Sequence, residues 1–372
     1  MEKKRILIMM MEVGNGHKIP ALAIESYIQR TYPNEYDIKV IDFAKDLGNG
    51  LLDKFCKYGW KFCLKHPAFF SLLYRLFDIR HAKYVSRFFG RKLISKVGGL
   101  IKDFEPSLIL STHLFSSDYL AFLKNKGKID VPCVSINIEP FDSHYFWIHP
   151  ELDTIVFSEK AKRDFIKRGV SESKIKIFDY CLRPDFSFNL PSKKDLRKKL
   201  GLDSEKLTLL LAAGGEGIGN IQHVLKDIIK KNLDVQVLAV TGRNKGLHKK
   251  LKKMKANNQN ISVFGYVHNM EELMKASDLI CGKSGPNFTF EALALKRPII
   301  YTYSMMNERP TRDFIVKNKL GWHFSRHRDL TAFVQKILED KSKLNMVENN
   351  IQLFDFKCGT QEVSEYLLSL MK

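Results

Sequence analysis

The chain has 372 residues, with 61 Lys or Arg against 41 Asp or Glu, a formal net charge of +20 at pH 7. This length predicts two domains or one large one. The apolar runs are too short for a membrane-spanning helix, which needs ~20 residues. The start, Lys3–Met11, is too short for a signal peptide. The six cysteines form no Cys-x-x-Cys pair, which argues against a zinc site and for a reducing cytoplasm.

The first half alternates strand-like and helix-like patterns, which predicts a mostly parallel sheet covered by helices. The run Ile6–Met11 predicts a strand and Ile19–Thr31 a helix. Further strands are predicted at Asp37–Asp42, Leu108–Ser111, Cys133–Ile138 and Thr154–Phe157.

The positive charge is densest between Leu51 and Leu100, where eleven Lys or Arg stand beside eleven aromatics and only Asp53 and Asp78 are acidic. Basic residues beside exposed aromatics are typical of a helix at a membrane surface. A nucleic-acid groove has a similar make-up, because bases stack on aromatic rings. The third interpretation is a pair of core helices with a basic outer face.

The pattern lapses at Pro184–Lys194, which predicts a linker. Strand and helix patterns then resume, with strands in LTLLLAA, VQVLAVTG, ISVFGYV, DLIC and RPIIYTY and helices at Ile221–Lys231, MEELMKAS and TFEALALK. We therefore predict two Rossmann-like domains, residues 1–186 and 187–372. The helical pattern from Leu330 to Met371 either completes the second domain or packs back on the first.

Each predicted domain has a glycine-rich turn after its first strand. These turns are Gly14-Asn15-Gly16 and Gly214-Gly215-Glu216-Gly217, the second followed by a helix that starts near Ile218. Ligands of such sheets bind at the carboxyl ends of the strands, so a cleft between the domains would gather both turns. Free N–H groups at the second turn would suit a phosphate. Neither a P-loop nor a dinucleotide fingerprint is present, and a plain tight turn is the alternative.

A third turn, Lys283-Ser284-Gly285-Pro286, follows a strand in the second half and opens a helix that carries Glu291. A carboxylate there can accept hydrogen bonds from both hydroxyls of a ribose. The alternative is a charge that compensates the helix start. Asn307 and Glu308, after the next strand, offer a second polar pair to the same cleft.

His17 lies at the start of the first helix. The positive end of the helix dipole disfavours imidazolium, so the ring would stay neutral and could act as a general base. Glu139, Asp142, His144 and His149 surround Trp147 after a later strand. A zinc site there is a poor interpretation, because ligand pairs at standard spacing are missing.

Three stretches together resemble the monogalactosyldiacylglycerol synthase and processive diacylglycerol glucosyltransferase family. They are Gly14–His17, Glu139–His149 and KSGPNFTFEALALKRP at Lys283–Pro298. The family is related to the peptidoglycan lipid-intermediate N-acetylglucosaminyltransferase. The resemblance implies the GT-B fold, two Rossmann-like domains with a cleft between them. It also implies inversion at the anomeric carbon, no metal, no cofactor apart from the UDP-sugar substrate, and work at a membrane surface.

The resemblance also assigns residues. It implies catalytic roles for His17 and Glu139. It implies that substrate is bound by Gly14, Asn15, Gly16, His144, Trp147, Arg183, Gly214, Gly215, Glu216, Gly217, Lys283, Ser284, Gly285, Pro286, Glu291, Asn307 and Glu308. The family has Asp where Glu139 stands, so the role of Glu139 stays open. It has Gln where Asn307 stands and Asn where Thr311 stands, so the identity of the hexose stays open.

The expected function is transfer of glucose or galactose from a UDP-hexose to diacylglycerol or a glycosyl-diacylglycerol. The expected place is the cytoplasmic face of the cell membrane, with a peripheral attachment to an anionic surface and no nucleic acid as partner. One alternative is an N-acetylglucosaminyltransferase that acts on an undecaprenyl-linked intermediate. Another is a soluble GT-B enzyme such as a nucleotide-sugar epimerase, and a third is a basic nucleic-acid-binding protein.

Overall fold

The computed structural model describes residues 3–12, 14–48, 50–186, 190–217, 220–256 and 258–371. The chain divides into two units. The first contains residues 1–184 and 358–372, and the second contains residues 185–357. Residues 187–189 of the predicted linker, the predicted boundary at residue 187 and the predicted helix start at Ile218 lie outside the described residues.

The first unit is built on a parallel sheet of order β2-β1-β3-β4-β5-β6. Its strands are β1 (Lys4–Met10), β2 (Tyr36–Asp42), β3 (Leu108–Ser111), β4 (Cys133–Ile136), β5 (Asp153–Val156) and β6 (Ile175–Ile177). Its α-helices are α1 (Lys18–Thr31), α2 (Gly50–Lys65), α3 (Pro67–Leu76), α4 (Ala82–Phe89), α5 (Arg91–Phe104), α6 (Leu114–Asn125), α7 (Glu159–Lys167) and α16 (Thr360–Ser369). Short helical turns are η1 (Phe43–Leu47), η2 (Tyr145–Trp147), η3 (Glu172–Lys174) and η4 (Pro184–Phe186), the last of which runs into the second unit.

The second unit repeats this plan with the parallel order β12-β11-β10-β7-β8-β9. Its strands are β7 (Thr208–Ala212), β8 (Gln236–Val240), β9 (Ile261–Phe264), β10 (Leu279–Lys283), β11 (Ile299–Tyr303) and β12 (Gly321–His323). Its helices are α8 (Lys193–Lys199), α9 (Ile221–Lys230), α10 (Lys245–Lys255), α11 (Met270–Ala276), α12 (Pro286–Ala294), η5 (Met306–Glu308), α13 (Arg309–Lys317), α14 (His327–Glu339) and α15 (Ser342–Phe354).

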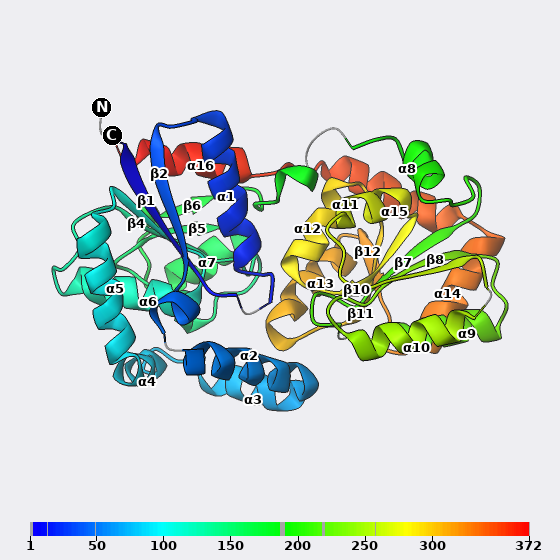
Figure 1. Cartoon of the computed structure of the whole chain (residues 1–372), viewed down its shortest axis with the longest axis horizontal. Coiled ribbons are helices and arrows are strands. Elements are labelled where there is room, and N and C mark those ends of the chain that lie inside the picture. The colour runs from blue at the N-terminus through cyan, green and yellow to red at the C-terminus, as the bar shows by residue number, and fades with distance from the viewer. Residues whose placement is uncertain are drawn as a thin grey trace. The chain divides into compact units, whose positions relative to one another are not determined.

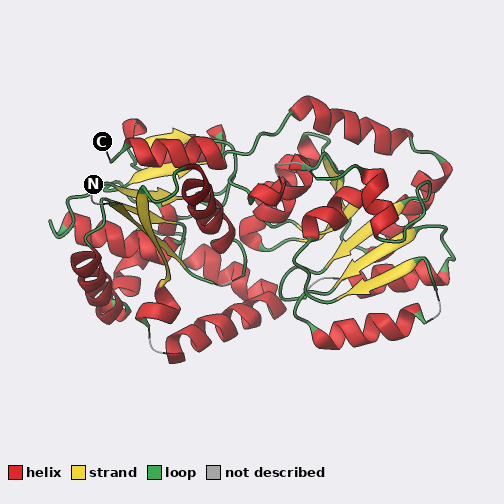
Figure 2. Ribbon diagram, turned by 45° about the horizontal axis from the view of Figure 1, so that its top comes forward, coloured by secondary structure: helices red, strands yellow, loops and turns green. Residues whose placement is uncertain are grey.

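The central strands are buried on both faces, which explains why they read as continuous apolar runs rather than alternating ones. In β1, Ile6 to Met9 are at most 1% exposed, and all of β7 is buried. Helices cover both faces of each sheet, as Figure 2 shows. The sequence-based prediction of two parallel, helix-covered sheets is confirmed.

The end of the chain returns to the first unit. Helix α16 packs against α1, and the hydroxyls of Tyr27 and Tyr32 donate to the Glu365 carboxylate at 3.0 and 2.8 Å (Figure 1). Gly359 approaches the backbone of Asp179 so closely that a Cβ atom would lie 1.9 Å from the Asp179 carbonyl oxygen. The described chain from Cys358 onward is therefore part of the first sheet's helical cover.

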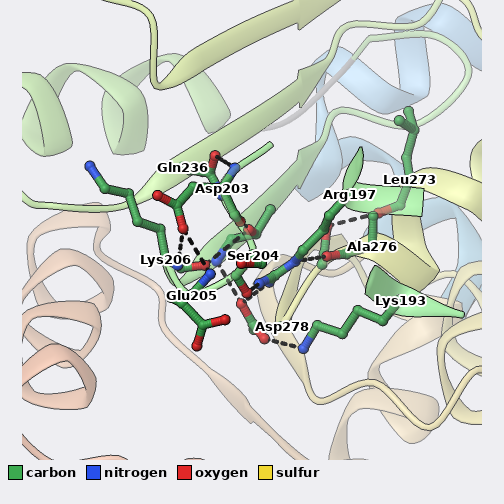
Figure 3. A network of polar contacts seen from close by, with 12 residues as sticks. Lys193, Arg197, Asp203, Ser204, Glu205, Lys206, Gln236, Leu273, Ala276 and Asp278 are labelled. Carbon is green, nitrogen blue, oxygen red and sulfur yellow. Dashed lines mark hydrogen bonds and ion pairs between the residues drawn. The ribbon is translucent and has the colours of Figure 1, made fainter. Parts of the chain in front are cut away.

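A buried ion pair anchors α8 to the sheet of the second unit (Figure 3). The Asp278 carboxylate accepts from Arg197 Nη2 at 2.6 Å and from the Thr208 N–H at 2.7 Å, and it also pairs with Lys193. Burial opposes ionisation, but these partners hold the pKa of Asp278 below its ordinary value. Removing one partner of such a buried pair typically costs about 3–5 kcal/mol. The network holds together the amino ends of β7 and β10.

The two sheets have their switch points at equivalent positions. In each unit the strand order reverses beside the first strand, between β1 and β3 and between β7 and β10. Ligands of open α/β sheets bind at the carboxyl ends of the strands at this switch point. The loops after β1 and β3, and after β7 and β10, are therefore where a site is expected.

Candidate functional site

The Gly14–His17 turn connects β1 to α1 at the switch point of the first sheet. Gly14 has φ +72°, a left-handed conformation that glycine adopts without strain. A Cβ atom at Gly16 would lie 3.2 Å from Ile138 Cδ1, so this glycine lets the turn pack against the loop after β4. The turn thus brings His17 beside two other loops of the unit.

His17 is held in one tautomer. Its Nδ1 atom lies 2.7 Å from the carbonyl oxygen of Thr112, and the Thr112 hydroxyl donates to the His17 carbonyl at 2.8 Å. A carbonyl oxygen only accepts, so Nδ1 carries the proton and Nε2 keeps its lone pair. Burial lowers the pKa of His17 to about 4, although the bond to Thr112 opposes the shift. The ring is therefore a neutral hydrogen-bond acceptor near pH 7.

Aromatic rings fix the orientation of this imidazole. The His113 ring lies edge-on with its centroid 4.3 Å away, and the Trp147 ring stacks at 6.1 Å with an interplanar angle of 28°. Trp147 is only 1% exposed. Such packing leaves His17 little rotational freedom, which is what a general base requires.

The loop after β4, residues 137–149, carries Glu139 and is tied down by its neighbours. Asn137 accepts from the Glu139 N–H at 3.1 Å and donates to the Asp142 carbonyl at 2.8 Å. The Tyr74 hydroxyl, from α3, donates to Glu139 at 3.1 Å and also contacts Asp142. Glu139 follows Ile138, whose side chain abuts the glycine turn. The two predicted catalytic residues, His17 and Glu139, thus belong to packed neighbouring loops.

Both ring nitrogens of His144 form hydrogen bonds with backbone groups. Nε2 donates to the Tyr74 carbonyl at 2.8 Å, and Nδ1 accepts from the Phe146 N–H at 3.3 Å. This geometry favours a role in holding the loop. Its predicted role in substrate binding stays a prediction.

Helix α4 also contacts the loop of residues 137–149, through Lys83. Lys83, 8% exposed, donates to the Ile148 carbonyl and lies 3.1 Å from His149 Nδ1. Burial lowers the pKa of Lys83 to about 8. His149 in turn donates from Nε2 to the Phe146 carbonyl at 2.8 Å. Lys83 therefore fixes the backbone on either side of Trp147.

In the second unit, the Gly214–Gly217 turn packs on the loop after β8. Gly217 has φ +67°, and a Cβ atom there would lie 2.2 Å from Asn244 Cβ. Asn244 also donates to the Gly217 carbonyl at 3.0 Å. Gly214, with φ +70°, has open space where a Cβ would stand. Within the described residues, no hydrogen bond is donated by the backbone N–H of Gly214 or Gly215.

The turn after β10 brings a second set of polar groups to the switch point. Lys283 pairs with Glu308, and Glu308 accepts from the Met305 N–H at 3.2 Å. A Cβ atom at Gly285 would lie 3.5 Å from Glu308 Oε1. Ser284 donates to Ser304 at 2.7 Å. Lys283, Ser284, Gly285 and Glu308 are thus brought together.

Three further predicted residues occupy distinct positions. Glu291 is 6% exposed in the second turn of α12, the helix that Gly285 and Pro286 begin. Asn307 lies half-buried in η5, directly before Glu308. Arg183 belongs to the first unit, in the segment between β6 and η4. The binding roles assigned to all three stay predictions.

The basic window forms helices whose apolar side chains are largely exposed. In α2, Phe55 is 75% and Tyr58 71% exposed; at the end of α4, Phe89 is 81% exposed. Further exposed apolar residues are Phe62, Phe69, Leu72, Leu76, Phe77, Ile79, Tyr84, Val85 and Phe88. The core-helix interpretation accounts for none of these side chains. No helix of the described chain is both apolar and long enough to cross a bilayer.

Sequence reasoning missed several residues that shape the site. Thr112 and His113 follow β3, and the segment Ser111–His113 after a short apolar run was the available signal. Tyr74 of α3 and Lys83 of α4 bond to Glu139 and Ile148, each 65 residues further along the chain. No local sequence pattern marks them.

Comparison with known proteins assigns the two halves separately. The model described as monogalactosyldiacylglycerol (MGDG) synthase matches residues 17–179. The model for the glycosyltransferase family 28 C-terminal domain matches residues 213–307. The first match contains His17 and Glu139. The second match contains the turns Gly214–Gly217 and Lys283–Pro286 and ends one residue before Glu308.

Curated relatives cover nearly the whole chain. Monogalactosyldiacylglycerol synthase 1 of Arabidopsis thaliana is 30% identical over 89% of this chain, which spans 64% of that relative's length. Probable monogalactosyldiacylglycerol synthase 3 of Oryza sativa subsp. japonica is 30% identical over a match that covers 90% of this chain and 68% of that relative's length. The processive diacylglycerol beta-glucosyltransferase of Bacillus pumilus is 26% identical over 97% of this chain and 94% of its own.

Solved structures share the fold at low sequence identity. Anabaena HepE, solved with UDP-glucose, has a TM-score of 0.56 at 15% identity, covering 98% of this chain and 99% of its own. A UDP-GlcNAc 2-epimerase from Neisseria meningitidis has a TM-score of 0.63 at 14% identity, covering 98% and 100%. These likenesses confirm the expected GT-B class of fold.

Proposed function

Because the chain belongs to the monogalactosyldiacylglycerol synthase family, we propose that it transfers a hexose from a UDP-sugar to the free hydroxyl of diacylglycerol or a glycosyl-diacylglycerol. The hexose is glucose or galactose. The acceptor hydroxyl attacks the anomeric carbon from the face opposite UDP, a new glycosidic C–O bond forms, and the bond to the diphosphate breaks. The configuration at the anomeric carbon is inverted.

The observation that carries this proposal is the state of His17. Its Nδ1–H is committed to the Thr112 carbonyl at 2.7 Å, which leaves the Nε2 lone pair to take the proton of the attacking hydroxyl. The pKa of about 4 keeps that lone pair unprotonated near neutral pH. Glu139 supplies a negative charge in the neighbouring loop that favours the imidazolium formed during attack.

The second unit is proposed to hold the donor. The N–H groups of Gly214 and Gly215, and the start of α12 after Gly285, suit the diphosphate. Lys283 adds a cation beside Gly285. The Glu291 carboxylate would accept from the ribose hydroxyls, and Asn307 with Glu308 would contact the hexose. This donor set stabilises the leaving diphosphate through N–H groups and a side-chain cation.

We further propose that α2, α3 and α4 lie on an anionic membrane surface, on the cytoplasmic face of the cell membrane. Their exposed aromatic side chains support apolar insertion, and the basic residues of the same window support attraction to anionic lipid. Replacing Lys57, Lys61 and Lys65 by Gln should weaken vesicle binding mainly at low salt. The side chain of Trp60 is only partly exposed and lies near Gly14, so the exposed pair Phe55 and Phe69 is the better test. Replacing Phe55 and Phe69 by Ser should weaken the part that persists at high salt.

The proposal is tested with radiolabelled UDP-glucose and UDP-galactose, each with diacylglycerol in mixed vesicles. The wild type should form a labelled glycolipid with one of them. His17→Ala should lower turnover by roughly 10²–10⁴-fold, the usual worth of a general base, while UDP affinity stays unchanged. Equal turnover in a folded His17→Ala protein would contradict the assignment of the base. Absence of glycolipid with both donors would contradict the function.

A further inference from the structure

His113 lies directly before α6, with its ring in contact with that of His17. Its Nδ1 atom accepts a hydrogen bond from the Phe115 N–H at 3.2 Å. A ring nitrogen that accepts carries no proton, so the one proton of the neutral imidazole is on Nε2. Burial lowers the pKa of His113 well below its ordinary value, so the ring is neutral near pH 7. The side chain of His113 therefore has a single donor group, Nε2–H.

Packing holds this ring in place. His113 is 3% exposed, and its ring lies against those of Phe43 and Phe115, with centroids 5.3 and 5.6 Å away. The backbone carbonyl of His113 accepts from the Ser116 hydroxyl and from the Ser117 N–H, each at 3.0 Å. The direction of the Nε2–H bond is therefore fixed by the fold.

The Nε2–H group of His113 has no acceptor among the residues that the structure describes. It does not donate to His17, although the two ring centroids are 4.3 Å apart. A buried donor without an acceptor lowers stability, so such a group in a native fold requires an explanation. An oxygen atom of a substrate bound at His17 would provide the missing acceptor.

The two imidazoles present opposite groups to such a substrate. His17 presents the lone pair of its Nε2, because its Nδ1–H bonds to Thr112, whereas His113 presents an N–H. The complement of this pair is a hydroxyl, which donates, with a second oxygen close by that only accepts. An alcohol with an ester on the adjacent carbon has this pattern, since an ester carbonyl oxygen is an acceptor and has no proton to donate.

We infer that His113 donates a hydrogen bond to the ester carbonyl beside the free hydroxyl of the acceptor lipid, and that this bond makes the protein prefer diacylglycerol to a dialkyl ether of glycerol. The inference rests on the proposed function, because it places the free hydroxyl on His17. The ether has the same hydroxyl and can have the same chains, but it lacks the carbonyl. His113 then determines specificity for the linkage of the chains.

Binding is measured without a sugar donor. The probes are 1,2-dibutyrylglycerol and its ether counterpart, 1,2-di-O-butylglycerol, both titrated into protein with ¹⁵N-labelled histidine rings. The Nε2–H resonance of His113, identified by its absence in His113→Asn, should shift with the diester and stay in place with the diether. The diester should bind about tenfold more tightly, the effect of one hydrogen bond whose loss leaves a buried donor unpaired.

Two variants of His113 separate its donor from its role at the start of α6. His113→Asn retains a side-chain oxygen that can cap the helix but has no nitrogen at the position of Nε2, so it should bind both probes equally. His113→Gln extends an amide N–H toward that position and loses the cap, so it should retain a preference for the diester while unfolding at lower urea. The control is His81→Asn, at an exposed histidine before α4 whose side chain forms no cap, and it should bind as the wild type does.

The transfer assay gives the same ratio from kcat/KM. With long-chain diacylglycerol and dialkylglycerol in vesicles, the wild type should prefer the diester by about tenfold, and His113→Asn should lose this preference. The KM for the UDP-sugar should stay unchanged. A rise of that KM in His113→Asn, with the preference for the diester retained, would assign His113 to the donor sugar and overturn the inference.

Other results would also overturn it. Equal binding of the two probes by the wild type would mean that no carbonyl is recognised. Equal losses for both probes in His113→Asn would mean that His113 only positions His17, and a lost preference in His81→Asn would mean that the ratio does not report on this site. Glycolipid formed without preference for the diester would contradict this inference alone. Diester binding at His113 without any glycolipid would contradict the proposed transfer alone.

Discussion

The hydroxyl of Tyr74, on α3, donates a hydrogen bond to the carboxylate of Glu139, with 3.1 Å between the two oxygens. Helix α3 exposes apolar side chains such as Phe69 and Leu72, and its Tyr74 contacts the loop of residues 137–149. Tyr74→Phe should remove a bond to a charged group, worth about 1.5–3 kcal/mol. We expect kcat to fall by about tenfold or more, while the KM for the UDP-sugar stays unchanged.

The control for this prediction is Tyr58→Phe, which removes an exposed hydroxyl of α2 that makes no hydrogen bond in the described chain. It should leave kcat unchanged. If both variants have wild-type kcat, Tyr74 does not position Glu139.

Three buried histidines of the first unit predict a loss of stability in mild acid. Burial lowers the pKa of His17 to about 4 and those of His113 and His149 well below 6.5. The unfolded chain therefore binds protons that the folded chain does not once the pH falls below about 6.5. Their stabilising effect is complete above that pH and declines below it, by about 1.4 kcal/mol per pH unit for each histidine. For His17 the decline ends near pH 4.

The measurement is urea unfolding at pH 7.5 and pH 5.5. In a Trp322→Phe protein the remaining tryptophans, Trp60 and Trp147, both report on the first unit. The free energy of unfolding should be lower at pH 5.5, and His17→Gln should reduce the difference between the two values. Equal stability at both pH values would contradict the burial of neutral imidazoles.

Glu291 should contribute to nucleotide affinity. Loss of a carboxylate that accepts from the ribose should weaken UDP binding by about 1.5–3 kcal/mol, or roughly 10–150-fold. Calorimetry of Glu291→Ala with UDP measures this, and Glu339→Ala, an exposed carboxylate of α14, is the control. An unchanged dissociation constant would reduce Glu291 to a structural charge of α12.

Two glycines of one turn should respond differently to the same substitution. Gly214→Ala adds a methyl group to open space and costs about 1–2 kcal/mol of left-handed strain. Gly217→Ala adds the same strain and also an overlap with Asn244 and Thr241, so about 1–3 kcal/mol more is expected. Urea unfolding monitored at Trp322, the tryptophan of the second unit, compares them. Equal losses would mean that the loop after β8 yields to the extra methyl.

Much of the fold could be predicted because the sequence of a buried parallel strand is a short run of apolar residues. The run at Leu108–Ser111 was predicted to the residue, and β2 begins one residue earlier than predicted. The run at Cys133–Ile138 is longer than β4, which ends at Ile136, because the side chain of Asn137 bonds within the loop of residues 137–149. Strand β6 has three residues and a charged centre, and the apolar pattern gave no sign of it.

Only those residues of the candidate site that directly follow a strand in the sequence could be predicted. The glycine turns and His17 stand at strand ends, so sequence order places them. The tautomer of His17 depends on a backbone carbonyl, that of Thr112, and every residue has one. Tyr74 and Lys83 belong to helices whose exposed aromatics dominate the pattern, and their inward contacts arise from tertiary packing. Such contacts carry no local signature.

The return of the chain at Cys358 makes the second unit an insertion within the first. The two ends of the first unit's segments meet there, where the Leu182 N–H donates to the Thr360 hydroxyl at 3.0 Å and that hydroxyl donates back to the Leu182 carbonyl at 2.8 Å. A peptide of a few residues from Pro184 to Cys358 would therefore close the first unit into one continuous polypeptide. The second unit, residues 185–357, is already continuous. We therefore expect each unit to fold as a separate protein, and titration of UDP into each would assign the nucleotide to one of them.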